Sequence, residues 1–384
     1  MTTLLSPFTV RGLTVANRIV MSPMTRQRSP LGVPGADVAE YYRKRAEGGT
    51  GLIVTEGIAI DHSSSVDSPD VPRLFGDDAL AGWKAVVDGV HAEGGRIVPQ
   101  LWHVGPLWGA MTEVDPDVTP MRPSGLWGTP GTTAYPQEYI ERSLPAVRAM
   151  TDEDIDEVIA AYATAARNAA EAGFDGIALH GGHGYLLDAF MWSDTNRRTD
   201  RWGGDAAGRA AFPAAVVRAI RAEIGHDLPI FYRFSQHKQQ DYKARIAETP
   251  DELGVLLGAL ADAGVDVFDA SIRYFNTPAF EGSDLTLAGW AKKLTGKAAM
   301  AVGSIGMPKG AASAAMTAHG NNTTDTSVAN DHTIDDAADR VESGEFDLVA
   351  IGRLHLSNPD LVARIRDGLD PVEFDRDRHE ANLH

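Results

Sequence analysis

The sequence predicts an α/β fold, a closed (β/α)8 TIM barrel, on three observations. Short apolar runs rich in β-branched residues alternate with longer segments of helical period, as in βαβ units. The number of such runs is the number of strands that closes this barrel. Most of them are almost continuously apolar, which is typical of parallel strands covered on both faces. The predicted strands span residues 18–24, 51–55, 96–101, 176–180, 230–234, 265–271, 298–303 and 347–351.

The opening segment, FTVRGLTV at residues 8–15, predicts a small β-hairpin ahead of the first barrel strand. Arg11 and Gly12 stand at its turn. We expect this hairpin to cover the bottom of the barrel.

Helices are predicted between the strands, because apolar residues there recur at intervals of three and four. Such stripes occupy residues 80–90, 155–166 and 253–260. Thr151 with Asp154 precedes the second stripe and has the spacing of an N-cap residue and its acidic partner.

Two stretches interrupt this alternation. Residues from about 105 to 148 follow the third strand, are rich in Pro, Gly, Thr and Trp, and are too long for an ordinary loop, so we expect a lid. Residues 308–333 are small and polar and predict a mobile excursion before the last helix. No linker divides the chain, so a single domain over residues 1–384 is expected.

Composition excludes several classes of protein. The net charge of −18 disfavours nucleic acid or an anionic membrane as a partner, since phosphate repels a negative surface. Without cysteine the chain can form no disulfide, thiolate nucleophile or Cys-based metal site. No apolar run is long enough to span a membrane and no secretory signal is recognisable, so a cytoplasmic location is expected.

The chemistry of such a barrel lies where its strands end. The residues at the predicted strand ends are therefore the candidate site residues: Pro23, Met24, Thr25, Glu56, Gly57, Gln100, Trp102, His103, His180, His183, Tyr185, Arg233, Gly303, Ser304, Gly352 and Arg353.

The ends of the last two strands predict a phosphate site. Gly303 and Ser304 follow the seventh strand, and Gly352 and Arg353 follow the eighth. Glycine-rich turns can present backbone N–H groups to a phosphate, and an arginine can hold its charge. The alternative is that these glycines only form tight turns.

Three further side chains indicate a planar heterocycle. Gln100 offers a donor and an acceptor that match a pyrimidine edge, and Thr25 offers a hydroxyl. Arg233 needs an anion or an electron-rich ligand edge, because an unpaired charge in a barrel mouth is costly. Together with the phosphate site, this set fits flavin mononucleotide (FMN), with Arg233 near the ring locus that gains charge on reduction. The alternative for Arg233 is a structural ion pair.

His180, His183 and Tyr185 follow the fourth strand. Two imidazole donors that converge on one oxygen would polarise a carbonyl or nitro group, and the Tyr185 phenol could supply a proton. Alternatively, the two histidines bind a metal, with His103 and Asp269 as additional ligands, in a metal-dependent barrel hydrolase. Tyr185 could also be a packing residue.

Several motifs resemble the Old Yellow Enzyme family of FMN-dependent ene-reductases. The resemblance runs in order over nearly the whole chain, and the HGGHGYLL element is the most specific part. The matching motifs are NRIVMSPMTR at 17–26, QLWHVG at 100–105, HGGHGYLLDAF at 180–190, DTNRRTDRWGG at 194–204, VGSIG at 302–306 and IGRLHLSNPDL at 351–361.

The resemblance implies a role for each site residue. Pro23, Met24 and Thr25 would line the flavin, with the Thr25 hydroxyl tuning its redox behaviour. The backbone at Gly57 would approach the ring closely. Gln100 and Arg233 would hold the pyrimidine, and Trp102 would form a wall of the substrate pocket. His180 and His183 would bind the electron-withdrawing group of the substrate, and Tyr185 would donate the proton.

The implied reaction is a ping-pong reduction. NADPH or NADH reduces bound FMN, which then passes hydride to the β-carbon of an unsaturated aldehyde, ketone or nitro compound while Tyr185 protonates the α-carbon. Some members carry Asn where this chain has His183, and another branch carries Cys in place of Thr25. The segment 271–280 also departs from the family pattern, which would lead us to expect a more basic sequence at Tyr274.

A third alternative is a non-catalytic flavin-binding protein. The sequence leaves the oligomeric state open.

Overall fold

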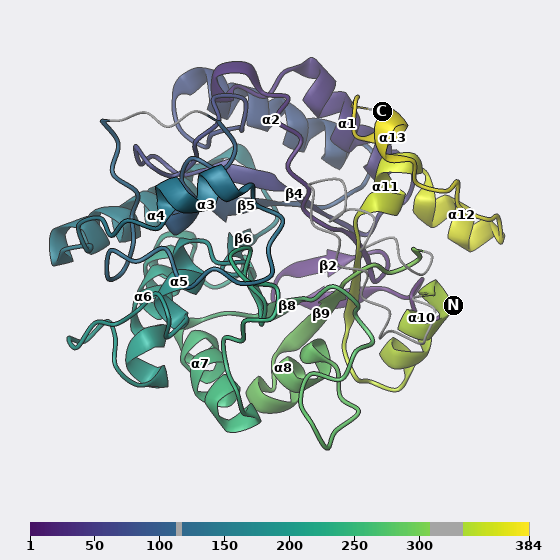
Figure 1. Cartoon of the computed structure of the whole chain (residues 1–384). Helices are drawn as coiled ribbons and strands as arrows, with labels where there is room; N and C mark the ends of the chain where they lie inside the picture. The colour runs from purple at the N-terminus through teal and green to yellow at the C-terminus, as the bar shows by residue number, and fades with distance from the viewer. Residues whose placement is uncertain (113–116, 308–332, 384) are drawn as a thin grey trace.

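The computed structural model describes residues 1–112, 117–307 and 333–383 and contains the predicted closed barrel of parallel strands (Figure 1). The strands follow one another around the barrel in chain order, and the last closes against the first where Val349 pairs with Ile19. The barrel strands are β3 (Ile19–Met21), β4 (Leu52–Ala59), β5 (Ile97–Trp102), β6 (Ile177–His180), β7 (Ile230–Ser235), β8 (Val267–Ser271), β9 (Ala298–Val302) and β10 (Leu348–Ile351).

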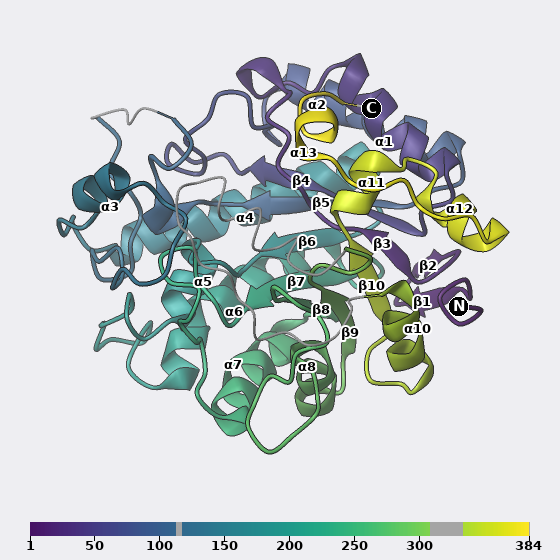
Figure 2. The same cartoon turned by 45° about the vertical axis from the view of Figure 1, so that its right-hand side comes forward.

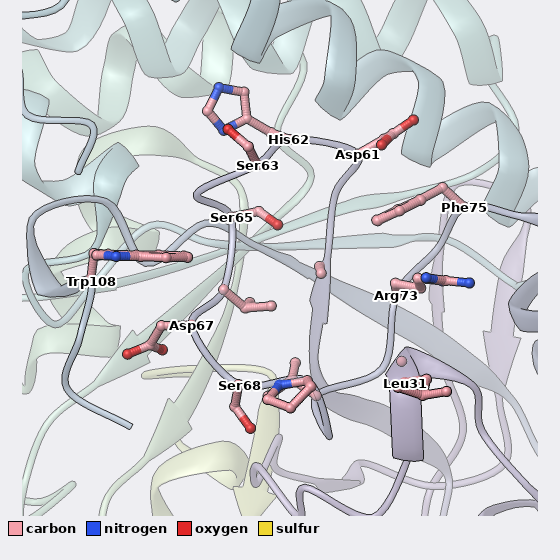
Figure 3. A pocket seen from close by; sticks show the side chains of 15 residues that line it. Leu31, Asp61, His62, Ser63, Ser65, Asp67, Ser68, Arg73, Phe75 and Trp108 are labelled. Carbon is pink, nitrogen blue, oxygen red and sulfur yellow. The ribbon is translucent and has the colours of Figure 1, made fainter. Parts of the chain in front are cut away.

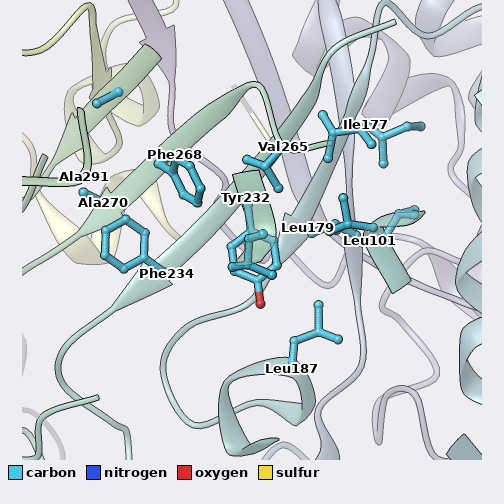
Figure 4. Packing of buried hydrophobic residues seen from close by; sticks show 14 of the residues in the cluster. Leu101, Ile177, Leu179, Leu187, Tyr232, Phe234, Val265, Phe268, Ala270 and Ala291 are labelled. Carbon is cyan, nitrogen blue, oxygen red and sulfur yellow. The ribbon is translucent and has the colours of Figure 1, made fainter. Parts of the chain in front are cut away.

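Side chains alternate between the two faces of each strand and build two packed layers. Val98, Phe231 and Val267 belong to the cluster that fills the barrel interior. Tyr232 and Phe268, one position further along their strands, belong to the layer under the helices, part of which is shown in Figure 4. Burial on both faces explains why these strands are almost continuously apolar in sequence.

Helices surround the barrel (Figure 1). The predicted stripes lie on the second, fourth and seventh helices, and α4 begins with the expected capping box of Thr151 and Asp154. The helices are α1 (Ala36–Glu47), α2 (Asp77–Ala92), α3 (Gln137–Ser143), α4 (Asp152–Ala172), α5 (Leu186–Met191), α6 (Ala206–Ile224), α7 (Pro250–Ala263), α8 (Leu287–Thr295), α10 (Ile334–Glu342), α11 (Arg353–Ser357), α12 (Leu361–Asp367) and α13 (Arg376–His379), with short 3-10 turns η1 (Pro30–Gly32) and η2 (Gly105–Leu107).

The N-terminal hairpin forms as predicted, with β1 (Phe8–Val10) antiparallel to β2 (Leu13–Val15). Leu13 and Val15 are buried in the same cluster as the inward-facing strand residues, so the hairpin closes one end of the barrel. Figure 2 shows the hairpin and α3 at opposite ends.

Three details extend or limit the sequence predictions. The second barrel strand does not end at Thr55 but runs to Ala59, with a shift of register between Val54 and Gly57. The predicted lid contains η2 and α3, and its role as a lid stays a prediction. The predicted excursion at 308–333 lies, apart from its last residue, outside the described residues.

In the part of the chain that is described, no helix combines the length and apolar character needed to cross a membrane.

Candidate active site

The segment after β3 is held in place by a buried carboxyl group. Glu56 in β4 accepts hydrogen bonds from the backbone N–H groups of Arg26 (2.8 Å) and Gln27 (3.2 Å). Burial raises the pKa of Glu56 to about 7. Glu56 thereby fixes the chain immediately after Thr25, whose own side chain is exposed, whereas Pro23 and Met24 are half-buried.

Gln100 has the features expected of a residue that binds a polar ligand edge. It is 2% exposed, and its side-chain nitrogen Nε2 is buried without a hydrogen-bond partner. A buried amide without a partner is costly, so the vacant donor fits a ligand acceptor such as the flavin pyrimidine.

Arg233 is buried in the barrel mouth and is paired with Asp269. Its Nε donates to Asp269 Oδ2 (2.6 Å), and its Nη2 donates to Ser22 Oγ (3.1 Å). The ion pair that the sequence left open for Arg233 is therefore present. These contacts use two of the three guanidinium nitrogens of Arg233. The ion pair with Asp269 therefore leaves the third nitrogen, Nη1, for a ligand.

The predicted phosphate residues come together at the ends of β9 and β10, which are neighbouring strands. Arg353 Nη2 donates to Ser304 Oγ (3.1 Å). Gly303 has a φ of 152°, and a Cβ there would lie 2.3 Å from the carbonyl oxygen of Ile272, so only glycine fits. Ser304 has a φ of 51°, an uncommon conformation for a residue with a side chain. This turn with its adjacent guanidinium fits the phosphate of FMN.

His180, His183, Tyr185 and Trp102 form one cluster of rings. The His180 ring centroid lies 5.0 Å from that of His183 and 4.6 Å from that of Tyr185. Trp102 stacks on His180 at 6.1 Å and meets Tyr185 edge-on at 5.0 Å. The structure thus brings together the four residues that the sequence predicted for substrate binding.

The protonation states of this cluster suit hydrogen-bond donation by neutral groups. Burial, with the Arg233 charge nearby, lowers the pKa of His180 well below its ordinary value, and burial also lowers that of His183. Nδ1 of His180 is buried without a partner. Nε2 of His183 lies 2.7 Å from Ser271 Oγ, and either atom could be the donor; in the tautomer in which the hydroxyl donates, the His183 proton is on Nδ1. Burial raises the pKa of Tyr185, which therefore keeps its proton.

Gly57 packs closely against the indole ring of Trp102, a contact that could not be predicted from the sequence. A Cβ on Gly57 would lie 2.4 Å from the Trp102 indole. The glycine is therefore required for Trp102 to pack against β4, whatever else approaches this backbone.

A fully buried ion pair supports the loop that carries His183 and Tyr185. Lys238 Nζ donates to Asp188 Oδ1 (2.7 Å), and both side chains are inaccessible to solvent. Asp188 Oδ2 in turn accepts from the N–H of Gly184 (2.6 Å). The backbone N–H of His183 donates to Ser235 Oγ (2.8 Å). The segment 235–242 therefore fixes the loop on its buried side.

The same segment also binds the predicted lid. The N–H of Gly131 donates to the carbonyl of Gln240 (3.0 Å), and the N–H of Tyr242 donates to the carbonyl of Thr132 (2.7 Å). The lid residue Tyr139 belongs to a buried hydrophobic cluster against which Tyr185 packs. The histidine loop, segment 235–242 and the lid thus form one hydrogen-bonded and packed unit.

The additional residues that a metal site would need are engaged elsewhere. His103 Nε2 lies 3.1 Å from His62 Nδ1, and Asp269 is paired with Arg233. Among the described residues, no group of three or more His, Cys, Asp or Glu side chains is arranged to hold a metal ion. The metal-dependent hydrolase is therefore not favoured.

A cavity of about 540 Å³ lies beside the lid, between Trp108 and Phe75 (Figure 3). Trp108, which lines this cavity, belongs to the same packed group as Trp102, and Tyr185 packs against that group. None of the strand-end residues predicted for FMN or substrate lines this cavity. It is distinct from the candidate site.

Four residues of the site were missed by reasoning from sequence. Ser271 ends β8 and contacts His183, the His237 ring lies 5.0 Å from that of His183 in a tilted arrangement, and Lys238 and Asp188 support the loop. The run SQHKQQ at residues 235–240 was a usable signal, since polar residues that include a histidine and a lysine follow Arg233 at the end of β7. Asp188 gave no signal, because it lies within an apolar helix.

Several buried histidines predict instability in acid. Burial lowers the pKa of His237 to about 3 and that of His355 to about 4, and it lowers the pKa of His103 as well. The unfolded chain binds protons below about pH 6.5, where these folded groups do not, so stability falls as the pH drops. The raised pKa values of Glu56, Asp67, Asp188 and Asp269 act in the opposite direction, but a carboxyl group with an ordinary pKa near 4 binds few protons in the unfolded chain above pH 5, whereas every buried histidine loses stability in this range. Urea titrations at pH 7 and pH 5 should show the free energy of unfolding falling by more than about 2 kcal/mol. An unchanged value would contradict the neutral state of these histidines.

Comparisons with known proteins identify a family model, sequence relatives and solved structures that are similar to this chain. The family model of the NADH:flavin oxidoreductase / NADH oxidase family matches residues 3–371. A 12-oxophytodienoate reductase of Oryza sativa subsp. japonica is 32% identical, over 94% of this chain and 87% of its own length. A chanoclavine-I aldehyde reductase of Penicillium roqueforti is 32% identical, over 98% and 92%. The structure of morphinone reductase in complex with tetrahydroNAD has a TM-score of 0.77 at 28% identity, covering 97% of this chain and 93% of that one.

The Old Yellow Enzyme homologue of Zymomonas mobilis shares the fold, with a TM-score of 0.76 at 24% identity, covering 97% of this chain and 94% of that one. The matches extend over almost the whole barrel, including the strand ends described above. The chain therefore belongs to the NADH:flavin oxidoreductase / NADH oxidase family, the Old Yellow Enzyme family indicated by its motifs, and is an NAD(P)H-dependent flavin oxidoreductase that uses FMN.

Proposed function

We propose that the protein is an ene-reductase that acts on carbon–carbon double bonds activated by a carbonyl or nitro group. The observation that carries this proposal is the cluster of His180, His183 and Tyr185, in which His180 presents a buried nitrogen without a partner. Two neutral imidazole donors beside a protonated phenol match the charge and proton demands of such a reduction. The relatives whose names identify them as 12-oxophytodienoate and morphinone reductases support the same class.

In this proposal the strand-end residues hold the cofactor. Gln100 and Arg233 bind the pyrimidine of FMN, Pro23, Met24 and Thr25 line the ring, and the turn-forming pairs at the ends of β9 and β10 bind its phosphate. Those pairs are Gly303 with Ser304 and Gly352 with Arg353. When bound there, FMN would supply the hydride-transfer chemistry between NADPH or NADH and the β-carbon of the acceptor.

The protein's own residues do the remaining work. His180 and His183 hold the carbonyl or nitro oxygen and stabilise the negative charge that develops on it. Tyr185 places its proton at the α-carbon, and Trp102 forms a wall beside it. The lid residues around Tyr139 pack on Tyr185 from the other side, so we infer that the lid shapes the substrate pocket.

Anaerobic NADPH oxidation by the purified holoenzyme with 2-cyclohexen-1-one tests this function. The expected result is oxidation that depends on the enone, with cyclohexanone as the product. A yellow protein that binds FMN but oxidises no NADPH with enones, enals or nitroalkenes would instead be a flavin-binding protein without this activity.

The donor pair makes a separate prediction about binding. Phenolates imitate the enolate-like charge of the reaction, so phenol should bind the oxidised enzyme and perturb its visible spectrum. His180→Ala removes one donor to a charged oxygen, which is worth about 1.5–3 kcal/mol, so the affinity should fall at least about tenfold. His91→Ala, which changes a partly exposed histidine on α2, is the control and should bind phenol normally. Unchanged affinity in His180→Ala would exclude the donor pair.

A further inference from the structure

Arg273 is a half-buried cation in the loop that follows β8, and its charge is not used by the site described so far. Its terminal nitrogen Nη2 is buried without a hydrogen-bond partner. Among the described residues, no Asp or Glu forms an ion pair with it, whereas the buried arginines beside the same strand ends, such as Arg233 with Asp269, are paired. Burying a charged donor without a partner is costly, which indicates that an anion completes this position.

The position of Arg273 places that anion next to the ring cluster. Ser271, two residues earlier, contacts His183 at 2.7 Å. The guanidinium carbon of Arg273 lies 6.0 Å from the ring centroid of Tyr242 and 5.8 Å from that of Tyr274. Its charge also acts on His237, whose ring centroid is 5.0 Å from that of His183. Arg273 therefore lies on the side of the cluster formed by the loops after β7 and β8.

The loop that carries Arg273 is fixed at both ends. The N–H of Ile272 donates to the carbonyl of Val302 (3.2 Å), and the N–H of Phe275 donates to the carbonyl of Gly303 (3.0 Å). A guanidinium held on such a loop is pre-organised, so little conformational entropy opposes the binding of a ligand there.

We propose that Arg273 is a specificity-determining residue that binds a carboxylate carried by the enone substrate, at a point remote from the reacting double bond. The planar guanidinium fork matches a carboxylate in geometry and charge. Phosphate shares this chemistry, but Arg353 already serves the phosphate turn, whereas Arg273 accompanies His183 on the substrate side. The inference rests on the proposed function, because it takes His183 to be a substrate contact.

Binding of a matched pair of phenols tests the proposal without turnover. The probes are 3-(4-hydroxyphenyl)propanoate and its methyl ester, titrated into the oxidised holoenzyme and followed by its visible absorbance. The wild-type enzyme should bind the acid at least about tenfold more tightly than the ester, since hydrogen bonds between two charged groups are the strong ones. Arg273→Gln should bring this ratio close to one and leave the affinity for the ester unchanged. Arg273→Lys, which keeps the charge but loses the fork, should give an intermediate ratio.

Lys243→Gln is the matched control, because it makes the same change of charge at an exposed position of the neighbouring segment, and it should keep the wild-type ratio. Equal binding of acid and ester by the wild-type enzyme overturns the proposal. So does an Arg273→Gln variant that loses affinity for FMN or NADPH and keeps the wild-type ratio, because the anion would then be a cofactor phosphate. If neither phenol binds and 2-cyclohexen-1-one is not reduced, the proposed function fails as well. Reduction of the enone with no preference for the acid removes the Arg273 proposal alone.

Discussion

Tyr185→Phe should slow the oxidation of the reduced enzyme by 2-cyclohexen-1-one by about 10²–10⁴-fold, the usual contribution of a positioned general acid. Burial raises the pKa of Tyr185, so the phenol carries its proton throughout the working pH range. Among the described residues, none forms a hydrogen bond with its hydroxyl. The proton is therefore available to a substrate and is not committed to the protein.

Reduction of the flavin by NADPH needs no proton from Tyr185, so this half-reaction should change by no more than about threefold. Stopped-flow absorbance resolves the two half-reactions. Tyr139→Phe is the matched control, because it makes the same change at a buried tyrosine of the hydrophobic cluster on which Tyr185 packs. It should leave both half-reactions close to wild type. Equal slowing of both half-reactions in Tyr185→Phe would show that the ring only supports the site.

The barrel could be predicted from sequence because its strands carry a strong, local signal. A strand covered on both faces must be apolar throughout, and the interruptions between strands carry the helical period. The boundaries were less well determined at Val54 and Gly57, where the register of β4 shifts and the strand continues to Ala59. This stretch also packs Gly57 closely against Trp102, a contact between different strands that no local pattern reveals.

The site could be predicted in part for a different reason. In a barrel, strand ends converge, so His180, Gln100 and Arg233 could be brought together without knowing any side-chain position. The supporting contacts could not be predicted, because they join residues far apart in the chain. Ser271 contacts His183 across 88 positions, and Asp269 pairs with Arg233 across 36.

Lys238→Met should lower the free energy of unfolding by about 3–5 kcal/mol, as is usual when one partner of a buried ion pair is removed. Lys238 and Asp188 are both fully buried, and burial disfavours the charge on each, lowering the pKa of the lysine and raising that of the aspartate. Without Lys238, Asp188 must be either an uncompensated charge or a protonated acid. Urea unfolding of the holoenzyme measures this loss, and a change below about 1 kcal/mol would show that the pair is not a tight buried contact.

The double variant Lys238→Met/Asp188→Leu separates stability from positioning. Two apolar side chains of similar volume can replace a buried ion pair with little loss of stability, so the double variant should recover most of the unfolding free energy. It cannot restore the acceptor for the N–H of Gly184, which Asp188 Oδ2 provides at 2.6 Å. Gly184 stands between His183 and Tyr185, with a φ of 86°, and its neighbour His183 has a φ of 63°. Such a backbone persists only where surrounding contacts hold it. The double variant should therefore fold stably and still bind phenol weakly, whereas recovery of both properties would reduce the pair to a role in stability alone.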